Sequence, residues 1–223
     1  MSDPVGVLVP AAGVGVRLGP GAPKALRTLA GEPLLVHAVR GLRAAPSVGP
    51  VVVAAPASDV AAVRDLLAPY DVVVVAGGAE RQDSVRAALA ALDPGVDLVL
   101  VHDAARCLTP VAVVEAVAAC LRGGAGAVVP VLPVADTVKQ VCGDRVVATL
   151  DRSALRAVQT PQGFRREVLE QAHAAASGAA TDDAGLVEAL GLPVRTVAGH
   201  EEAFKVTRPI DLLLAEAVLA ARR

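Results

Sequence analysis

The sequence predicts an α/β protein: a Rossmann-like three-layer sandwich with a mainly parallel sheet and an inserted β-hairpin. Short apolar runs without polar alternation recur along the chain, which is typical of strands buried on both faces. Helical patterns separate these runs, and this alternation favours right-handed βαβ units. At 223 residues, the chain is expected to form a single domain over 1–223.

The expected elements follow in order along the chain. Strands are expected over 5–9, 51–55, 72–76, 98–101 and 127–131. Helices are expected from Pro33 to about Ala44, from a cap at Ser58 to before Pro69, from Glu80 to about Leu92, from Thr109-Pro110 to Gly123, from Thr181, and from Thr207-Pro209 onward. Lys205 is expected to end a short strand before the last helix and so to face a cleft at the strand ends.

The segment 136–152 interrupts this alternation. Two strand-like stretches, 137–141 and 145–150, flank the turn residues Cys142, Gly143 and Asp144, which predicts a β-hairpin. A hairpin that stands alone is marginally stable in water, so this one is expected to pack on another surface. That surface could belong to a second subunit or to the chain's own sheet, and both interpretations remain open.

Composition excludes several classes of protein. The formal net charge of -2 argues against a nucleic-acid coat protein, which would need a basic face. The charge-free stretches are shorter than the roughly 20 apolar residues of a membrane-spanning helix. No signal peptide is expected at the Met-Ser-Asp-Pro start. The three cysteines, at 107, 120 and 142, are expected to be small core residues rather than disulfide or zinc ligands, which favours the cytoplasm.

A glycine-rich loop follows the first strand. It contains Ala11, Ala12, Gly13, Gly15 and Arg17, and Lys24 follows it. Such a loop lets backbone N–H groups approach phosphates, and two nearby cations suit phosphoryl or nucleotidyl transfer. Neither the dinucleotide fingerprint nor the P-loop fits, since Leu18 replaces the third glycine and Lys24 lies between Pro and Ala. An ordinary strand–helix turn with solvated cations is the competing interpretation.

The fourth expected strand ends at His102, Asp103 and Arg106. A carboxylate at the carboxyl end of a strand is well placed for Mg²⁺, and an arginine there can clamp an anionic second substrate. The alternative is an Asp–Arg pair that only caps the strand. For His102 we expect a structural hydrogen bond rather than metal binding.

Two further clusters begin helices. Gly77 and Gly78 open onto a helix start with Glu80 and Arg81, which favours an anion or the edge of a base, although a plain turn is also consistent. Thr181-Asp182-Asp183 is best interpreted as an N-cap with acids in the first turn.

In this order, the clusters resemble the cytidylyltransferases that act on 2-C-methyl-D-erythritol 4-phosphate in the non-mevalonate pathway of isoprenoid synthesis. The matching pieces are Pro10-Ala-Ala-Gly-x-Gly-x-Arg17, Pro23-Lys24, Gly77-Gly78-x-Glu80-Arg81-x-x-Ser84, Val101-His-Asp-Ala-Ala-Arg106, Asp136-Thr137-x-Lys139, Asp151-Arg152, Thr160-Pro-Gln162, Thr181-Asp182-Asp183 and Lys205-Val-Thr-Arg-Pro209. Where the family often has Asp, this chain has Ala79, so a base contact there must use the backbone.

The resemblance implies that the acceptor phosphate attacks the α-phosphorus of CTP and releases pyrophosphate, with Mg²⁺. It implies CTP contacts by Ala11, Ala12, Gly13, Gly15, Gly78, Arg81, Ser84 and Ala104, and catalytic roles for Arg17, Lys24 and Lys205. It implies Mg²⁺ on Asp103 and acceptor contacts by Arg106, Thr137, Arg152 and Thr160. The hairpin would be a dimerisation arm that carries Thr137 and Arg152 into the active site of the neighbouring subunit of a homodimer.

Three alternatives remain open. A cytidylyltransferase for ribitol 5-phosphate would share the CTP chemistry, and Asp136-Thr137 and Thr160-Pro161-Gln162 favour methylerythritol phosphate over it. A dinucleotide-dependent oxidoreductase is disfavoured by Leu18 and by the lack of an acid after the second strand. A catalytically inactive nucleotide sensor is disfavoured by Arg17, Lys24 and Asp103.

Overall fold

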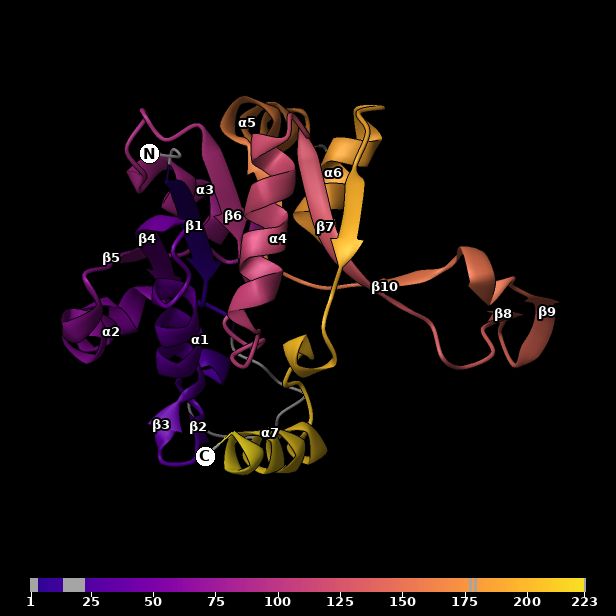
Figure 1. The fold of residues 1–223 in the computed structure, drawn as a ribbon, viewed down its shortest axis with the longest axis horizontal. Coiled ribbons are helices and arrows are strands. Elements are labelled where there is room, and N and C mark those ends of the chain that lie inside the picture. The colour runs from indigo at the N-terminus through magenta and orange to yellow at the C-terminus, as the bar shows by residue number, and fades with distance from the viewer. Residues whose placement is uncertain (1–3, 14–22, 177, 179, 223) are drawn as a thin grey trace.

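The structure is a computed structural model, and it describes residues 4–13, 23–176, 178 and 180–222. Within these residues, an eight-stranded sheet has the order β10-β7-β11-β6-β1-β4-β5, with β12 paired to β7 (Figure 1). Its strands are β1 (Val5–Pro10), β4 (Val48–Ala55), β5 (Val73–Ala76), β6 (Leu98–Val101), β7 (Ala127–Pro133), β10 (Arg156–Val158), β11 (Gln162–Arg165) and β12 (Arg195–Ala198).

The mainly parallel sheet is confirmed. Strand β1 pairs in parallel with β4 and β6, β4 with β5, and β12 with β7. Strands β10 and β11 run antiparallel to their neighbours, and the sequence did not predict them. Both are short, and Gln162–Arg165 carries no apolar run that would signal a strand.

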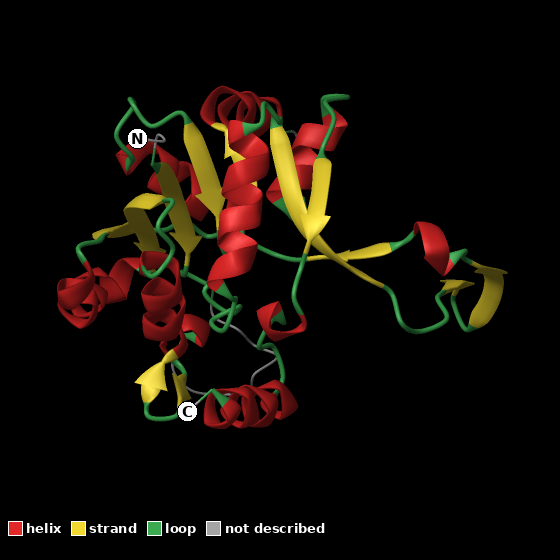
Figure 2. Ribbon diagram, in the orientation of Figure 1, coloured by secondary structure: helices red, strands yellow, loops and turns green. Residues whose placement is uncertain are grey.

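Helices cover both faces of the sheet, which confirms the three-layer sandwich (Figure 2). One core cluster joins β1 to α1 (Leu34–Arg43), α2 (Val60–Leu67) and α4 (Val111–Arg122). The other joins β1 to α3 (Arg81–Ala91), α5 (Arg166–Ala175) and α6 (Asp183–Ala189). Within β1, Val7 and Val9 belong to the first cluster and Leu8 to the second, as expected for a strand buried on both faces.

The last helix, α7 (Pro209–Ala221), packs at one end of the molecule. Ala215 of α7 and Val206 before it share a small apolar cluster with Leu29 and Leu108. The short strands β2 (Thr28–Leu29) and β3 (Glu32–Pro33) pair beside it. This packing fixes the segment that precedes α7 against the carboxyl end of the main sheet.

Several helix starts differ from the sequence prediction by one or two residues. Helix α4 has Pro110 as its N-cap, because the hydroxyl of Thr109 donates instead to the carbonyl of Arg106 at 2.8 Å. Ser58 lies inside a 3₁₀ turn, and Asp59 is the N-cap of α2. The predicted start at Glu80 is confirmed, since Glu80 is the N-cap of α3 and its amide donates to Oδ2 of Asp83 at 3.1 Å.

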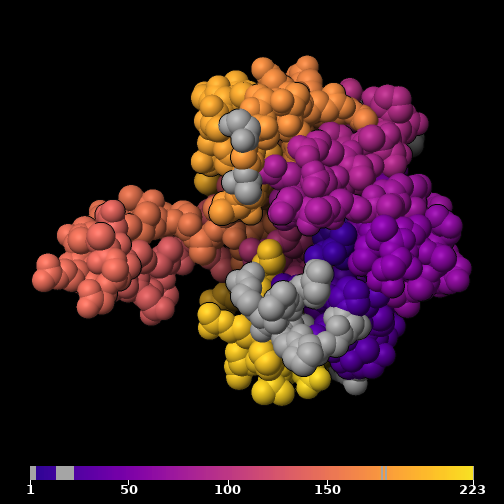
Figure 3. Space-filling model, turned by 180° about the vertical axis from the view of Figure 1, so that it is seen from behind, coloured from indigo at the N-terminus to yellow at the C-terminus, as the bar shows by residue number. Residues whose placement is uncertain are grey.

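The predicted hairpin is confirmed and stands apart from the main sheet. Strands β8 (Lys139–Cys142) and β9 (Arg145–Thr149) pair antiparallel, and Gly143 in the turn between them has a φ of +61°. The hairpin and its flanks form an arm that projects from the body (Figures 1 and 3), so this segment does not fold back onto its own sheet. On it, Val141 and Val146 are 58% and 60% exposed.

The arm also corrects an expectation about the cysteines. Cys107 is buried, as expected for a core residue, and Cys120 is half-buried. Cys142 is exposed at the end of β8, because the hairpin lies outside the core. No helix among the described residues has both the length and the apolar character needed to cross a membrane.

Candidate active site

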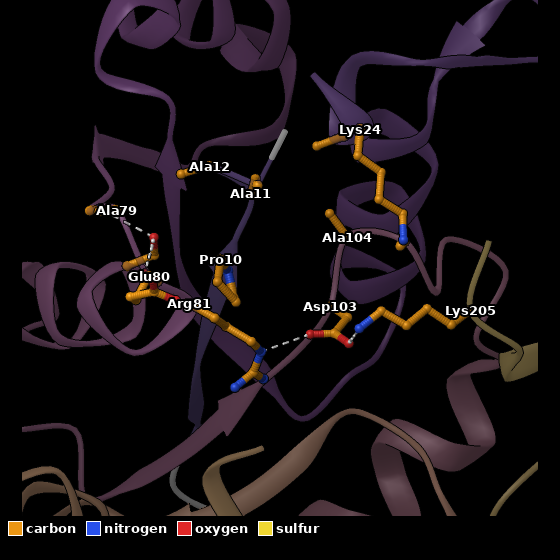
Figure 4. Close-up of a pocket in the computed structure, with 15 residues that line it drawn as sticks. Pro10, Ala11, Ala12, Lys24, Ala79, Glu80, Arg81, Asp103, Ala104 and Lys205 are labelled. Atoms are coloured by element: carbon orange, nitrogen blue, oxygen red, sulfur yellow. Dashed lines mark hydrogen bonds and ion pairs between the residues drawn. The ribbon is translucent and has the colours of Figure 1, made fainter. Parts of the chain in front are cut away.

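A cavity of about 230 Å³ opens at the carboxyl ends of β1 and β6 (Figure 4). The amide of His102 donates to the carbonyl of Leu8 at 2.9 Å, which extends the pairing of the two strands and holds Asp103 beside the loop that follows β1. Described residues lining the cavity are Pro10, Ala11, Ala12, Gly13, Lys24, Ala25, Gly78, Ala79, Glu80, Arg81, Ser84, Asp103, Ala104, Ala105 and Lys205.

Most of the residues predicted to bind the nucleotide therefore lie around one cavity. The described members of the predicted CTP set all line this cavity, together with Lys24, Asp103 and Lys205. Gly15 and Arg17 lie outside the described residues. Figure 4 shows the ammonium groups of Lys24 and Lys205 on the same side of the cavity as the Asp103 carboxylate.

Asp103 is the electrostatic centre of the site. Its Oδ2 lies 2.7 Å from Nζ of Lys205, and its Oδ1 accepts from Nε of Arg81 at 3.2 Å. Burial alone would raise the pKa of Asp103, but the positive charges of Arg81 and Lys205 outweigh burial and hold that pKa well below its usual range. The carboxylate is therefore ionised and largely buried, with 9% of the residue exposed.

Lys205 reaches the cavity by a route that differs from the prediction. Strand β12 ends at Ala198, and a 3₁₀ turn over Glu201–Ala203 leads to a loop rather than to a strand. The amide of Val206 donates to the carbonyl of Ala105 at 2.8 Å, which fixes this loop beside the residues that follow β6. The predicted orientation toward the cleft is confirmed, although the predicted strand is wrong.

The start of α3 forms another wall. The amide of Gly78 donates to Oγ of Ser84 at 3.2 Å, so the turn is tied to the first residues of the helix. A Cβ on Gly78 would lie 2.2 Å from Cβ of Asp83, which is far closer than two non-bonded carbons can approach. Only glycine fits between the cavity and the helix start at this position.

A second cavity, of about 170 Å³, adjoins the first and shares Arg81, Asp103 and Lys205 with it. Predicted acceptor residues Arg106 and Thr160 line it. Oγ1 of Thr160 accepts from the amide of Asp103 at 3.0 Å and lies 3.2 Å from Nδ1 of His102. The structural hydrogen bond expected of His102 is thus present, and burial lowers the pKa of His102 to about 4.

Arg106 is more constrained than the sequence suggested. It donates from Nη1 to the carbonyl of Ala203 at 2.7 Å and from Nη2 to that of Val158 at 3.1 Å, so it ties the segment before Lys205 to β10. Burial lowers the pKa of Arg106. Its buried Nε has no hydrogen-bond partner among the described residues.

The two acids at the start of α6 have different roles. Asp182 is the N-cap: its Oδ1 accepts from the amide of Gly185 at 3.0 Å, and its Oδ2 from Nε2 of Gln162 at 2.7 Å. Asp183 is fully buried and forms an ion pair with Nη1 of Arg81 at 2.6 Å. The sequence predicted an N-cap followed by acids in the first turn; Asp182 is itself the N-cap, and only Asp183 lies in the first turn. The role of Asp183 was missed because neither its burial nor its contact with Arg81 has a local signal in the sequence.

Two predicted acceptor residues lie elsewhere. Among the described residues, Thr137 and Arg152 line neither of these cavities. Thr137 is exposed on the arm, and Arg152 donates to the carbonyl of Ala135 at its base, where it lines a separate, open cavity. A single chain does not bring these two residues to Asp103.

A family model described as 2-C-methyl-D-erythritol 4-phosphate cytidylyltransferase matches residues 5–221. The chain belongs to this family.

Similarity to members of this cytidylyltransferase family extends along the chain. The protein of that name from Frankia casuarinae is 62% identical over 220 residues, which cover 98% of this chain and 82% of that protein. The protein of the same name from Streptomyces avermitilis is 58% identical over 229 residues, which cover 97% of this chain and 92% of that protein. The crystal structure of the Thermus thermophilus cytidylyltransferase is 39% identical, with a TM-score of 0.79 over 97% of this chain and 99% of that one.

Proposed function

We propose that this protein transfers the cytidylyl group of CTP to 2-C-methyl-D-erythritol 4-phosphate, giving 4-CDP-2-C-methyl-D-erythritol and pyrophosphate in the non-mevalonate pathway. The observation that carries the proposal is the cavity in which the small-residue loop of Ala11–Gly13, Lys24, Asp103 and Lys205 meet. The family match over residues 5–221 supports the same reaction.

The chemistry requires electrostatics and positioning. An oxygen of the acceptor phosphate forms a bond to the α-phosphorus of CTP, the bond from that phosphorus to the bridging oxygen breaks, and pyrophosphate leaves with its electron pair. The acceptor phosphate is anionic near neutral pH, so the step needs no general base. Lys24 and Lys205, with Arg17 outside the described residues, stabilise the charge that develops on the α-phosphate and the leaving group.

The nucleotide fits along the wall formed by the β1 loop and the start of α3. The backbone around Ala11, Ala12 and Gly13 approaches the phosphates, and Ala104 borders them; Gly15, assigned to the same contact, lies outside the described residues. Gly78, Arg81 and Ser84 lie at the cytosine and ribose end, where the base is held by main-chain groups because Ala79 has no polar side chain.

A magnesium ion fits this donor set. Asp103 supplies one ionised carboxylate at the cavity wall, and Mg²⁺ commonly takes one or two carboxylates, with phosphate oxygens and water completing its shell. Asp103 would hold the ion, which would neutralise charge on the triphosphate. Lys205, which contacts Oδ2 of the same carboxylate, would then be available to the substrates.

The acceptor fits the second cavity, beside Arg106 and Thr160. Thr137 and Arg152 complete this subsite from the arm of a second subunit, so the active unit is a homodimer. The exposed Val141 and Val146 support this assignment, because an apolar two-stranded arm needs a surface to cover it. Residues 1–223 form one nucleotidyltransferase domain from which the arm, about 136–152, extends.

Pyrophosphate release tests the proposal. Purified protein is supplied with CTP and Mg²⁺, with methylerythritol 4-phosphate or ribitol 5-phosphate as the acceptor. Release with methylerythritol phosphate and little with ribitol phosphate supports the proposal. The reverse preference would identify a polyol-phosphate enzyme with the same nucleotide site, and CTP binding without release would identify a nucleotide sensor.

A further inference from the structure

A continuous series of polar contacts leads from helix α5 to the cavity. Nε2 of His173 lies 2.9 Å from Oδ1 of Asp183, whose Oδ2 accepts from Nη1 of Arg81 at 2.6 Å. Nε of Arg81 donates to Oδ1 of Asp103, and Oδ2 of Asp103 holds Lys205. The side chains thereby connect α5, α6 and α3 to the end of β6.

The direction of the first contact follows from its chemistry. An ionised carboxylate can only accept, so the proton between His173 and Asp183 belongs to Nε2 of the histidine. Nδ1 of His173 is buried and has no hydrogen-bond partner among the described residues, which suits a bare ring nitrogen better than an N–H. The ring is therefore the tautomer that donates to Asp183.

Asp183 depends on this donor because water cannot replace it. Its side chain is 0% exposed, and each of its oxygens has one protein donor, His173 or Arg81. Burial opposes the charge of Asp183, but the hydrogen bond from His173 and the charge of Arg81 keep its pKa below the usual value. Loss of the histidine N–H would leave Oδ1 buried without a donor.

The orientation of Arg81 depends on Asp183 in turn. Its planar guanidinium is held at two points, Nε on Asp103 and Nη1 on Asp183, by acids that come from different elements. Arg81 lines both cavities, so a rotation of this group would be felt where the nucleotide and the acceptor bind.

We propose that His173 is a positioning residue for nucleotidyl transfer: it orders Asp183, which orients Arg81 across Asp103. The inference rests on the proposed function for its activity readout. His173 touches no substrate in this role, and its side chain is 3% exposed, behind the wall of the cavity. The competing explanation is that the ring only fills space between α5 and α6.

A pair of variants separates these explanations. His173→Gln and His173→Met have unbranched side chains of similar length, but only the amide can donate to Asp183. The positioning role predicts that His173→Met lowers kcat by about 10- to 100-fold, with a smaller change in KM for CTP, and that His173→Gln stays close to wild type. Equal kcat values in the two variants, whether both normal or both low, would overturn the proposal.

Two controls keep the result interpretable. Leu169→Val, one turn earlier on α5, trims a fully buried core residue outside the contact series. It is expected to lower the thermal unfolding midpoint while leaving kcat unchanged. Thermal unfolding of both His173 variants shows that each is folded at the assay temperature. A fall in kcat for Leu169→Val as large as that for His173→Met would overturn the proposal.

A readout that needs no turnover separates this inference from the proposed function. The Nε proton of Arg81, assigned by loss of its NMR signal in Arg81→Lys, exchanges slowly with water while it is bonded to Asp103. Exchange is expected to stay slow in His173→Gln and to become faster in His173→Met. If wild type released no pyrophosphate, the proposed function would fail, and the exchange rates alone would decide the role of His173. Identical exchange in both variants would overturn it.

Discussion

Nζ of Lys205 lies 2.7 Å from Oδ2 of Asp103, although one residue precedes the last helix and the other follows a central strand. With Arg81 on Oδ1, this contact places two cations on one buried carboxylate. The carboxylate keeps both cations at the cavity, and it is also the group that suits a divalent ion.

Asp103→Asn is expected to lower kcat by roughly 10²–10³-fold, since a metal site of this kind contributes several kcal/mol to the transition state. The apparent Mg²⁺ concentration for half-maximal activity should rise. A titration of rate against Mg²⁺ measures both. Asp97→Asn, an exposed acid before the same strand, is the matched control and should behave as wild type. Normal Mg²⁺ dependence in Asp103→Asn would remove the metal from this residue.

Lys24→Ala is expected to lower kcat by about 10²–10³-fold, because it removes a positive charge from the cavity in which charge develops. The thermal unfolding midpoint should change little, since Lys24 lies at the cavity wall rather than in the core. Steady-state kinetics and thermal unfolding measure these quantities. Arg64→Ala, an exposed cation on α2, serves as the control. Near-normal turnover in Lys24→Ala would contradict its catalytic role.

Gly78→Ala is expected to raise KM for CTP and to lower thermal stability. The added Cβ would meet Cβ of Asp83, which belongs to the rigid first turn of α3, so the loop or the helix must move. Gly126→Ala is a matched control, because its Cβ would meet Val168 at an ordinary 3.7 Å. Equal behaviour of the two variants would show that the turn before α3 can relax without affecting the nucleotide site.

Mixtures of Lys24→Ala and Arg152→Ala subunits test whether active sites are shared. Arg152→Ala alone is expected mainly to raise KM for the acceptor phosphate. With arms exchanged, half of the dimers in an equal mixture hold one intact site, so about a quarter of wild-type activity should return at limiting acceptor. The assay follows pyrophosphate release after the subunits have been allowed to exchange. Activity no higher than the average of the parent proteins would place Arg152 in its own subunit's site.

The contribution of the Asp183 contacts to stability should depend on pH. Because its folded pKa is lowered, Asp183 contributes stability above its unfolded pKa of about 3.9, and this contribution is lost as the pH falls through the folded pKa. Asp183→Asn should therefore be less stable than wild type at pH 7, and the difference should narrow below about pH 4. Urea unfolding across this range measures it. Asp65→Asn, exposed on α2, should follow wild type throughout, and a gap for Asp183→Asn that widened in acid would contradict the assignment.

The features that could be predicted from the sequence are those set by residues close together along the chain. The buried strands β1, β4 and β6 carry continuous apolar runs, so the local pattern predicted them. The turn residues at Cys142–Asp144 likewise predicted the hairpin of the arm. Asp103 and Lys24 were placed at the site because strand ends and glycine-rich loops mark the carboxyl edge of a sheet.

The remaining features depend on how distant segments pack. The contact between His173 and Asp183 exists because α5 and α6 lie against each other, and no spacing along the chain predicts it. The same holds for Lys205, whose position comes from the Val206–Ala105 hydrogen bond and from α7 rather than from a strand. The short segments β10 and β11 are strands because β6 and β7 offer them partners.

The exposed arm offers a direct test of the proposed homodimer. In an isolated subunit, the amide protons of β8 and β9 are protected by one strand pairing and by little packing, so they should exchange with deuterated water rapidly. A surface laid over Val141 and Val146 would slow the same amides. Deuterium uptake by one peptide spanning 139–149, followed over a dilution series, would then give the subunit dissociation constant without a label or a substrate.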